Sequence, residues 1–147
     1  MFRGRFLHTI DSKGRISIPS KFRDIILEFY GGRLILTNDL VDKCIAVYTP
    51  KGWEELEAKV QKGPSMNEDV KAFIRLVFSS AEDCTIDTQG RILIPPRLRD
   101  YASLIKEVMV TGSPNNKFEL WNPGIWEETV SAVDPRTVAK KIAELGI

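Results

Sequence analysis

Two short segments of the chain each pair an aspartate with an arginine four residues later, across a glycine. They are Ile10–Asp24 (IDSKGRISIPSKFRD) and Ile86–Asp100 (IDTQGRILIPPRLRD), and nine of their fifteen positions are identical. An Asp side chain accepts hydrogen bonds from the amides of the turn that follows it, and Gly adopts the positive φ that closes such a turn. We therefore expect these residues to structure two hairpin turns: Asp11, Gly14, Asp87, Gly90 and Arg91.

The two arginines of these motifs, Arg15 and Arg91, have two interpretations. An exposed Asp–Arg pair contributes only about 0–1 kcal/mol, so a turn does not need the Arg for stability. Residues 3–24 carry six basic and two acidic side chains, a net charge of +4, whereas residues 79–100 carry three and four, a net charge of −1. Clustered cations repel one another in the free protein and are favourable opposite a polyanion. The first segment is thus predicted to bind DNA, and for Arg91 both interpretations stay open.

The predicted DNA contacts divide by position. Arg15 and Lys13, at the tip of the first hairpin, are expected to enter the major groove, where an Arg makes a bidentate contact to guanine. Arg3 and Arg5 are expected to hold phosphates and set the register, with Arg23 as a further phosphate contact. The second hairpin has Gln89 in place of Lys13 and is expected to support the fold or a neighbouring subunit.

The remaining chemistry of the sequence is sparse. Cys44 and Cys84 stand alone beside a single His8, so we expect buried free thiols and no metal site; a disulfide between the two is the alternative, but the fold does not need one. No phosphate-binding loop, dinucleotide fingerprint, metalloprotease or nucleophile-elbow motif occurs. We expect no enzyme activity, no cofactor and no small-molecule substrate.

Length and composition suit a globular protein. The chain has 147 residues, 43% hydrophobic and 28% charged, with a net charge of +1. No apolar run reaches the roughly 18 residues of a membrane span. The segment Met1–His8 lacks the apolar core of a signal peptide. We expect a cytoplasmic, nucleoid-associated protein without membrane contact.

The elements that position the motifs occur twice. In each copy two short β-branched runs flank the turn, a Pro begins a helix, and two further strands follow. The pattern predicts an α+β fold of two tandem β-β-α-β-β repeats. The expected division of the chain is a first repeat (1–49), connecting helices (50–80) packed on the barrel that the two repeats form together, a second repeat (81–122) and C-terminal helices (123–147).

A unit of about 45 residues buries too little apolar surface to be stable alone. We therefore expect the two copies to interleave their strands as an intramolecular pseudo-dimer. Flanking helices are expected to begin at Thr49–Pro50, at Asn122–Pro123, at Asp134–Pro135 and at a capping box, Ser65–Glu68.

The two Asp-x-x-x-Arg motifs, the Ile-x-Ile-Pro after each and the opening Met-Phe-Arg-Gly resemble the MraZ family of bacterial transcription regulators, within the AbrB-like (SpoVT-AbrB) group. The resemblance implies a swapped-hairpin β-barrel within one subunit and homo-oligomeric rings. It also implies binding to short direct repeats in the promoter of the division and cell-wall gene cluster, as a repressor. The DNA-facing basic positions of the group correspond to Arg15, Arg23, Arg91 and Arg99.

We interpret the chain as a sequence-specific double-stranded DNA-binding regulator that acts as an oligomer. Two alternatives come from other classes. One is an oligomeric scaffold whose basic segment meets an acidic protein surface. The other is the antitoxin role that some AbrB-like proteins have.

Overall fold

The computed structural model describes all 147 residues and contains the predicted β-β-α-β-β unit twice. The first copy comprises β1 (Arg5–Thr9), β2 (Arg15–Ser17), α1 (Ser20–Tyr30), β3 (Arg33–Asn38) and β4 (Ile45–Tyr48). The second comprises β5 (Glu82–Thr85), β6 (Arg91–Leu93), α4 (Pro96–Ala102), β7 (Glu107–Ser113) and β8 (Lys117–Trp121). The α+β class and the tandem duplication are confirmed.

Strands of one copy pair with strands of the other, as expected for an intramolecular pseudo-dimer. The main sheet is antiparallel with the order β1-β7-β8-β4-β3-β5, so the first strand of each copy lies beside the third strand of the other. The second strands, β2 and β6, form a separate two-stranded ribbon. The hydrogen-bonded ladders end at β1 and β5 and do not form the closed barrel that the resemblance implies.

A single core of 20 buried residues lies between the sheet, the ribbon and the helices of both copies. Phe2 and Phe22 come from the first copy and Phe118 from the second, and their rings pack at centroid distances of 5.0–5.3 Å. The Phe of the opening Met-Phe-Arg-Gly is therefore a core residue. Because both copies supply this core, neither repeat has one of its own.

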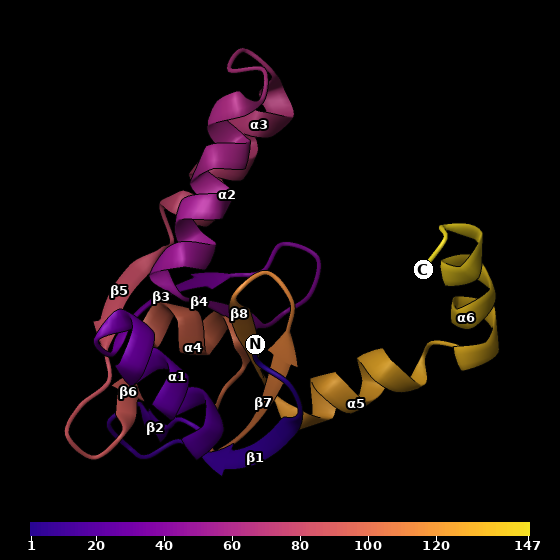
Figure 1. Ribbon diagram of the computed structural model, residues 1–147. Coiled ribbons are helices and arrows are strands. Elements are labelled where there is room, and N and C mark those ends of the chain that lie inside the picture. The colour runs from indigo at the N-terminus through magenta and orange to yellow at the C-terminus, as the bar shows by residue number, and fades with distance from the viewer.

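A helical arm joins the two copies and projects away from the sheet (Figure 1). It consists of α2 (Pro50–Lys62), α3 (Glu68–Phe73) and a π-helical turn, η1 (Ile74–Phe78). The base of the arm is fixed by the Thr37 hydroxyl, which donates to the Val77 carbonyl at 2.7 Å. Along the outer part of the arm, apolar side chains of α2 and α3 line a groove between these two helices: Leu56, Val60, Val70 and Phe73. The predicted capping box at Ser65 is wrong, since Asn67 caps α3 by accepting from the amides of Asp69 and Val70.

The C-terminal helices α5 (Pro123–Ser131) and α6 (Pro135–Glu144) begin at the predicted caps, Asn122 and Asp134. Trp126 anchors α5 by packing on Trp121 at 5.3 Å. Helix α6 extends away from the sheet and every one of its residues is exposed (Figure 1). No helix is both long and apolar enough to cross a bilayer.

Candidate nucleic-acid interface

The two Asp–Gly–Arg turns have the same hydrogen bonds. In the first, Asp11 Oδ1 accepts from the backbone amides of Lys13 and Arg15, both at 2.9 Å. In the second, Asp87 Oδ1 accepts from the amides of Gln89 and Arg91, again at 2.9 Å. The glycines have φ of 86° at position 14 and 77° at position 90. An L side chain is strained at such φ values, which explains why both copies have Gly there.

Each arginine of the motif is oriented by its own aspartate. Arg15 Nε donates to Asp11 Oδ2 at 2.9 Å, and Arg91 Nε donates to Asp87 Oδ2 at 3.0 Å. The Arg15 and Arg91 side chains remain 32% and 27% exposed. Their terminal Nη groups make no hydrogen bond within the protein. The turn thus holds a guanidinium in place through one nitrogen and leaves two nitrogens free to donate.

The motif arginines lie on the outward side of the β2–β6 ribbon. Arg15 pairs with Leu93 and Ser17 with Arg91, while the intervening pair, Ile16 and Ile92, is buried in the core. The backbone of each strand also reaches the other turn: the Ile18 amide donates to the Gly90 carbonyl, and the Ile94 amide to the Gly14 carbonyl. The two turns therefore lie at opposite ends of one short ribbon. Four residues of extended strand span about 13 Å, so the turns are separated by roughly that distance.

Each turn also receives an arginine from a helix of the other copy. A Cβ atom at Gly14 would lie 2.8 Å from Cζ of Arg99 in α4, and one at Gly90 would lie 2.7 Å from Nη1 of Arg23 in α1. Each contact is with the end of a flexible Arg side chain that can move, so the positive φ is the stronger reason for glycine at both positions. The exchange gives each turn two guanidinium groups, and Arg99 Nε is buried there without a hydrogen-bond partner.

The other predicted contacts fall into two groups. Lys13 is exposed at the first turn beside Arg15. Arg3 and Arg5 are exposed but lie before or at the start of β1, about six residues or roughly 20 Å from that turn. Arg23 lies at the second turn and not at the first. The structure thus brings Lys13, Arg15 and Arg99 together, and separately Arg23 and Arg91.

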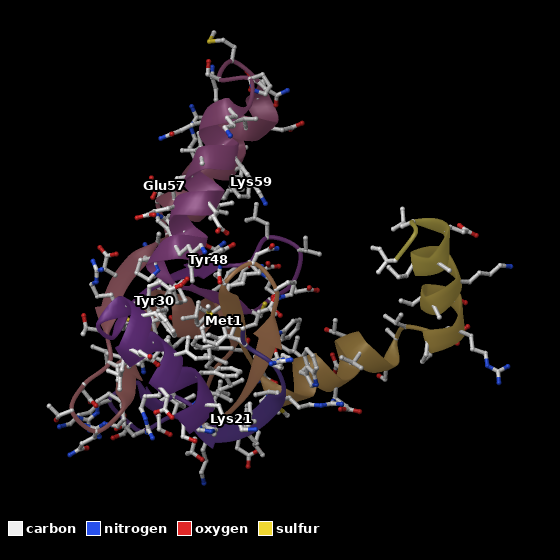
Figure 2. The ribbon with its side chains drawn as sticks, in the orientation of Figure 1. Met1, Lys21, Tyr30, Tyr48, Glu57 and Lys59 are labelled. Carbon is white, nitrogen blue, oxygen red and sulfur yellow. The ribbon has the colours of Figure 1, made fainter.

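The crossing of Arg23 and Arg99 was missed by sequence reasoning, although a signal was present. Arg23 and Arg99 occupy equivalent positions in the two repeats. Once the strands of the two repeats interleave, the helix of each repeat lies against the turn of the other repeat, and this could have predicted the contacts. Figure 2 shows two charged residues of the arm, Glu57 and Lys59, away from Lys21 at the start of α1.

His8, the only histidine, has a structural contact. Its Nδ1 donates to the Ser17 carbonyl oxygen at 2.8 Å, and the Ser17 hydroxyl lies 3.0 Å from the same nitrogen. This contact ties β1 to β2 below the turn.

The ionised form of each turn aspartate is favoured. Hydrogen bonds from the turn amides, that of Arg15 first, lower the pKa of Asp11 below 3.8, and the Arg91 amide does the same for Asp87. A carboxyl whose pKa is lowered by folding adds stability above its unfolded pKa, and that stability is lost as the pH falls through the folded pKa. We expect the turns to loosen only below about pH 4.

NMR titration tests this expectation. The Asp11 carboxyl should titrate with a midpoint below 3.8, and the Lys13 and Arg15 amide resonances should follow the same midpoint. In Asp11→Asn these amides should lose that transition, while the Gln89 and Arg91 amides of the second turn keep theirs. An Asp11 midpoint at or above 3.8 would contradict the observed turn geometry.

Fold and site together define a class: a duplicated α+β protein in which the second strands of the two copies form one ribbon that carries two oriented arginines. The chain belongs to the MraZ family. The family model described as "MraZ protein, putative antitoxin-like" matches residues 1–76 and again residues 77–142.

Curated relatives are similar over most of their length. A protein of Pseudomonas aeruginosa, named Transcriptional regulator MraZ, is 43% identical over 132 residues, which cover 90% of this chain and 87% of the relative. Proteins of the same name from Pseudomonas putida and Pseudomonas entomophila are 44% identical over 134 residues, 91% of this chain and 87% of theirs.

Proposed function

We propose that this protein is a transcription regulator that binds double-stranded DNA sequence-specifically through the two Asp–Gly–Arg turns and the β2–β6 ribbon between them. The observation that supports this most is the pair of oriented guanidinium groups on the β2–β6 ribbon. A regulator role also agrees with the name of the curated relatives, Transcriptional regulator MraZ. We place it in the cytoplasm, associated with the nucleoid.

The ribbon has suitable dimensions and chemistry for direct readout. The major groove is about 12 Å wide and admits a two-stranded β-ribbon. Arg15 binds Asp11 through Nε, so its Nη groups are positioned to donate to O6 and N7 of a guanine. Because the ion pair already restricts the side chain, binding loses less conformational entropy than it would with a free Arg.

The cations around the turns have distinct roles in this proposal. Lys13 and Arg99 supplement Arg15 at the first turn, and Arg23 supplies phosphate contact at the second. Arg3 and Arg5 contact phosphates beyond the ribbon, at the other end of β1. Phosphate contacts fix the register of the protein on DNA and the base contacts specify the sequence.

The proposed target is a promoter with short direct repeats, that of the division and cell-wall gene cluster, where the protein acts as a repressor. One ribbon reads only a few base pairs, so specificity requires several subunits on one DNA. We propose a ring-like homo-oligomer for this purpose. Helix α6 offers an available surface for self-association, because its apolar residues are exposed: Val138 and Ile142, with Leu145 just beyond.

A binding assay with the DNA upstream of the protein's own gene tests the proposal. We expect a retarded complex whose log affinity falls with log salt at a slope near −0.9 per phosphate contacted. At fixed salt a scrambled duplex of equal length and composition should bind at least ten times more weakly. Equal binding to both duplexes, or no binding at low salt, would refute sequence-specific recognition and favour the scaffold alternative.

The family description also names an antitoxin-like protein. In an antitoxin the surface beyond the hairpins would bind and inhibit a small toxin. Co-expression with the product of the neighbouring gene distinguishes the two roles: a toxin is lethal alone and silent with its antitoxin, whereas a promoter regulator alters only transcription.

A further inference from the structure

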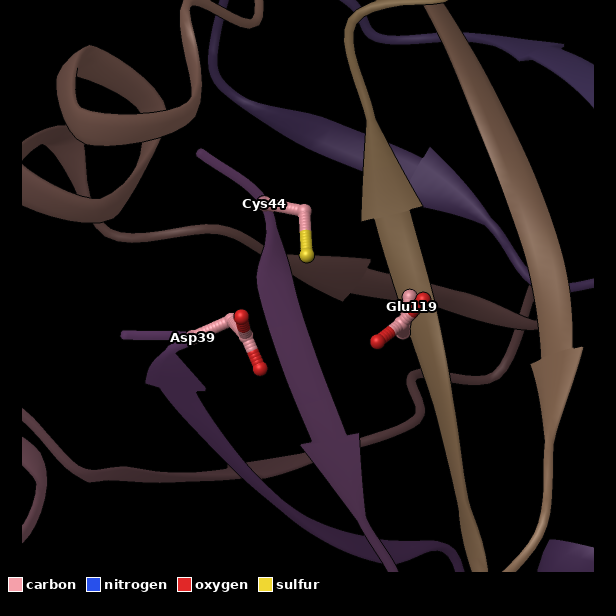
Figure 3. Close-up of side chains that lie close together, drawn as sticks. All are labelled: Asp39, Cys44 and Glu119. Atoms are coloured by element: carbon pink, nitrogen blue, oxygen red, sulfur yellow. The ribbon is translucent and has the colours of Figure 1, made fainter. Parts of the chain in front are cut away.

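Three side chains able to bind a metal ion meet beside the loop between β3 and β4. They are Asp39, which follows β3, Cys44, which precedes β4, and Glu119 in β8 (Figure 3). One carboxylate oxygen of each acid and the Cys44 sulfur all lie within 4.8 Å of one another. None of the three belongs to the proposed DNA interface.

The antiparallel register explains this meeting. The Asp39 amide donates to the Cys44 carbonyl at 3.0 Å, and Ala46 pairs with Glu119. Because side chains alternate along a strand, Cys44 and Glu119 share the face opposite the core residue Ile45. The cluster thus depends on three strand segments that are held by the sheet.

Each of the three side chains keeps one ligand atom free. Asp39 Oδ2 accepts from the amides of Val41 and Asp42, at 3.0 and 2.8 Å, which leaves Oδ1. Glu119 Oε1 accepts from Trp121 Nε1 at 3.1 Å, which leaves Oε2. Cys44 is 0% exposed, and its sulfur points toward the two carboxylates and makes no hydrogen bond (Figure 3).

No ion pair of the protein includes a residue of the cluster; burial raises the pKa of Glu119, and nearby Lys117 offsets this only in part. The three ion pairs join other residues: Arg15 to Asp11, Arg91 to Asp87 and Arg97 to Glu82. Two lysine ammonium groups lie over aromatic rings, Lys43 at 4.6 Å from the Tyr101 centroid and Lys117 at 5.6 Å from that of Tyr48. Partly buried carboxylates without an ion-pair partner are unfavourable, and a bound divalent ion compensates them.

We propose that Asp39, Cys44 and Glu119 form a binding site for a zinc-class divalent cation. One sulfur and two oxygen ligands match the donors that Zn²⁺ takes in proteins. Zn–S of about 2.3 Å and Zn–O of about 2.0 Å place tetrahedral ligand atoms about 3.3–3.5 Å apart. The three ligand atoms, which lie within 4.8 Å of one another, move closer together when the ion binds. On binding, the Cys44 thiol releases its proton to water, a metal–sulfur bond forms, and water takes the fourth position.

Cobalt binding tests this site without reference to DNA. Co²⁺ takes the place of Zn²⁺, and a thiolate ligand gives it a charge-transfer absorption band in the near ultraviolet. Titration of the reduced full-length protein with Co²⁺ should produce this band with one equivalent, and Zn²⁺ should displace it. Cys44→Ser should abolish the band, whereas Cys84→Ser, the matched control at the half-buried second cysteine, should keep it.

A second variant keeps the test decisive if Cys44→Ser does not fold. Glu119→Gln preserves side-chain size but replaces a charged carboxylate ligand by a weaker neutral amide, and it should weaken Co²⁺ binding at least tenfold, since even partners outside the ligand shell contribute about that much. Absence of the thiolate band in the wild type would overturn the proposal. So would a band that persists in Cys44→Ser or an unchanged affinity in Glu119→Gln.

Discussion

Arg15→Ala should weaken binding to the promoter repeats by roughly 5- to 150-fold for each hairpin that reads DNA. This range corresponds to the 1–3 kcal/mol of a bidentate Arg–guanine contact. The loss should multiply when several subunits occupy one DNA, because each subunit contributes its own contact. Preference for the cognate duplex over a scrambled one should shrink in parallel.

Arg91→Ala is the matched control for this experiment. It removes the same ion pair, 3.0 Å long against 2.9 Å, from a turn with the same amide hydrogen bonds. Any structural cost of losing an Asp–Arg pair is therefore common to both variants. Gln89 replaces Lys13 at the second turn, so we expect the smaller loss there. Affinities measured by fluorescence anisotropy, with oligomer mass checked by light scattering, report the difference. Unaltered affinity of an intact Arg15→Ala oligomer would refute the role of Arg15.

Phe22→Ala should lower the free energy of unfolding by about 3–5 kcal/mol. Phe22 is 1% exposed and packs on Phe2, Phe6 and Phe118, so truncation leaves a cavity at the junction of the two copies. The equivalent position of the second copy is Leu98, also 1% exposed. Phe22→Leu should therefore be tolerated better than Phe22→Ala.

Chemical denaturation at one fixed protein concentration measures these losses, since stability of an oligomer depends on concentration. Phe29→Ala is the exposed control, at 64% exposure, and should change stability by no more than about 0.5 kcal/mol. Because both copies share one core, unfolding should be a single transition. Separate transitions for the two repeats would contradict a shared core.

Sequence reasoning predicted the local structure well because turns depend on nearby residues. The Asp and Gly of each motif determine the hairpin turn through contacts within four residues. The exchange of strands followed from size, since one copy of about 45 residues cannot bury a core. The helix caps at Thr49 and Asn122 were also local signals, and both were confirmed.

Long-range placement was not predictable in the same way. Ser65 and Asn67 are both good cap residues, and the structure selects Asn67 where the chain turns between α2 and α3. The contacts of Arg23 and Arg99 depend on which copy's helix lies against which turn. In the Asp39–Cys44–Glu119 cluster, Glu119 lies 75 positions after Cys44 and 80 after Asp39, so no local sequence motif predicts the site.

A crystal structure of the protein on its promoter repeat tests the central proposal most directly. We expect the β2–β6 ribbon in the major groove, with Arg15 Nη atoms about 3 Å from O6 and N7 of one guanine and Nε still bound to Asp11. A complex in which the duplex contacts another face, with Arg15 distant from every base, would contradict it.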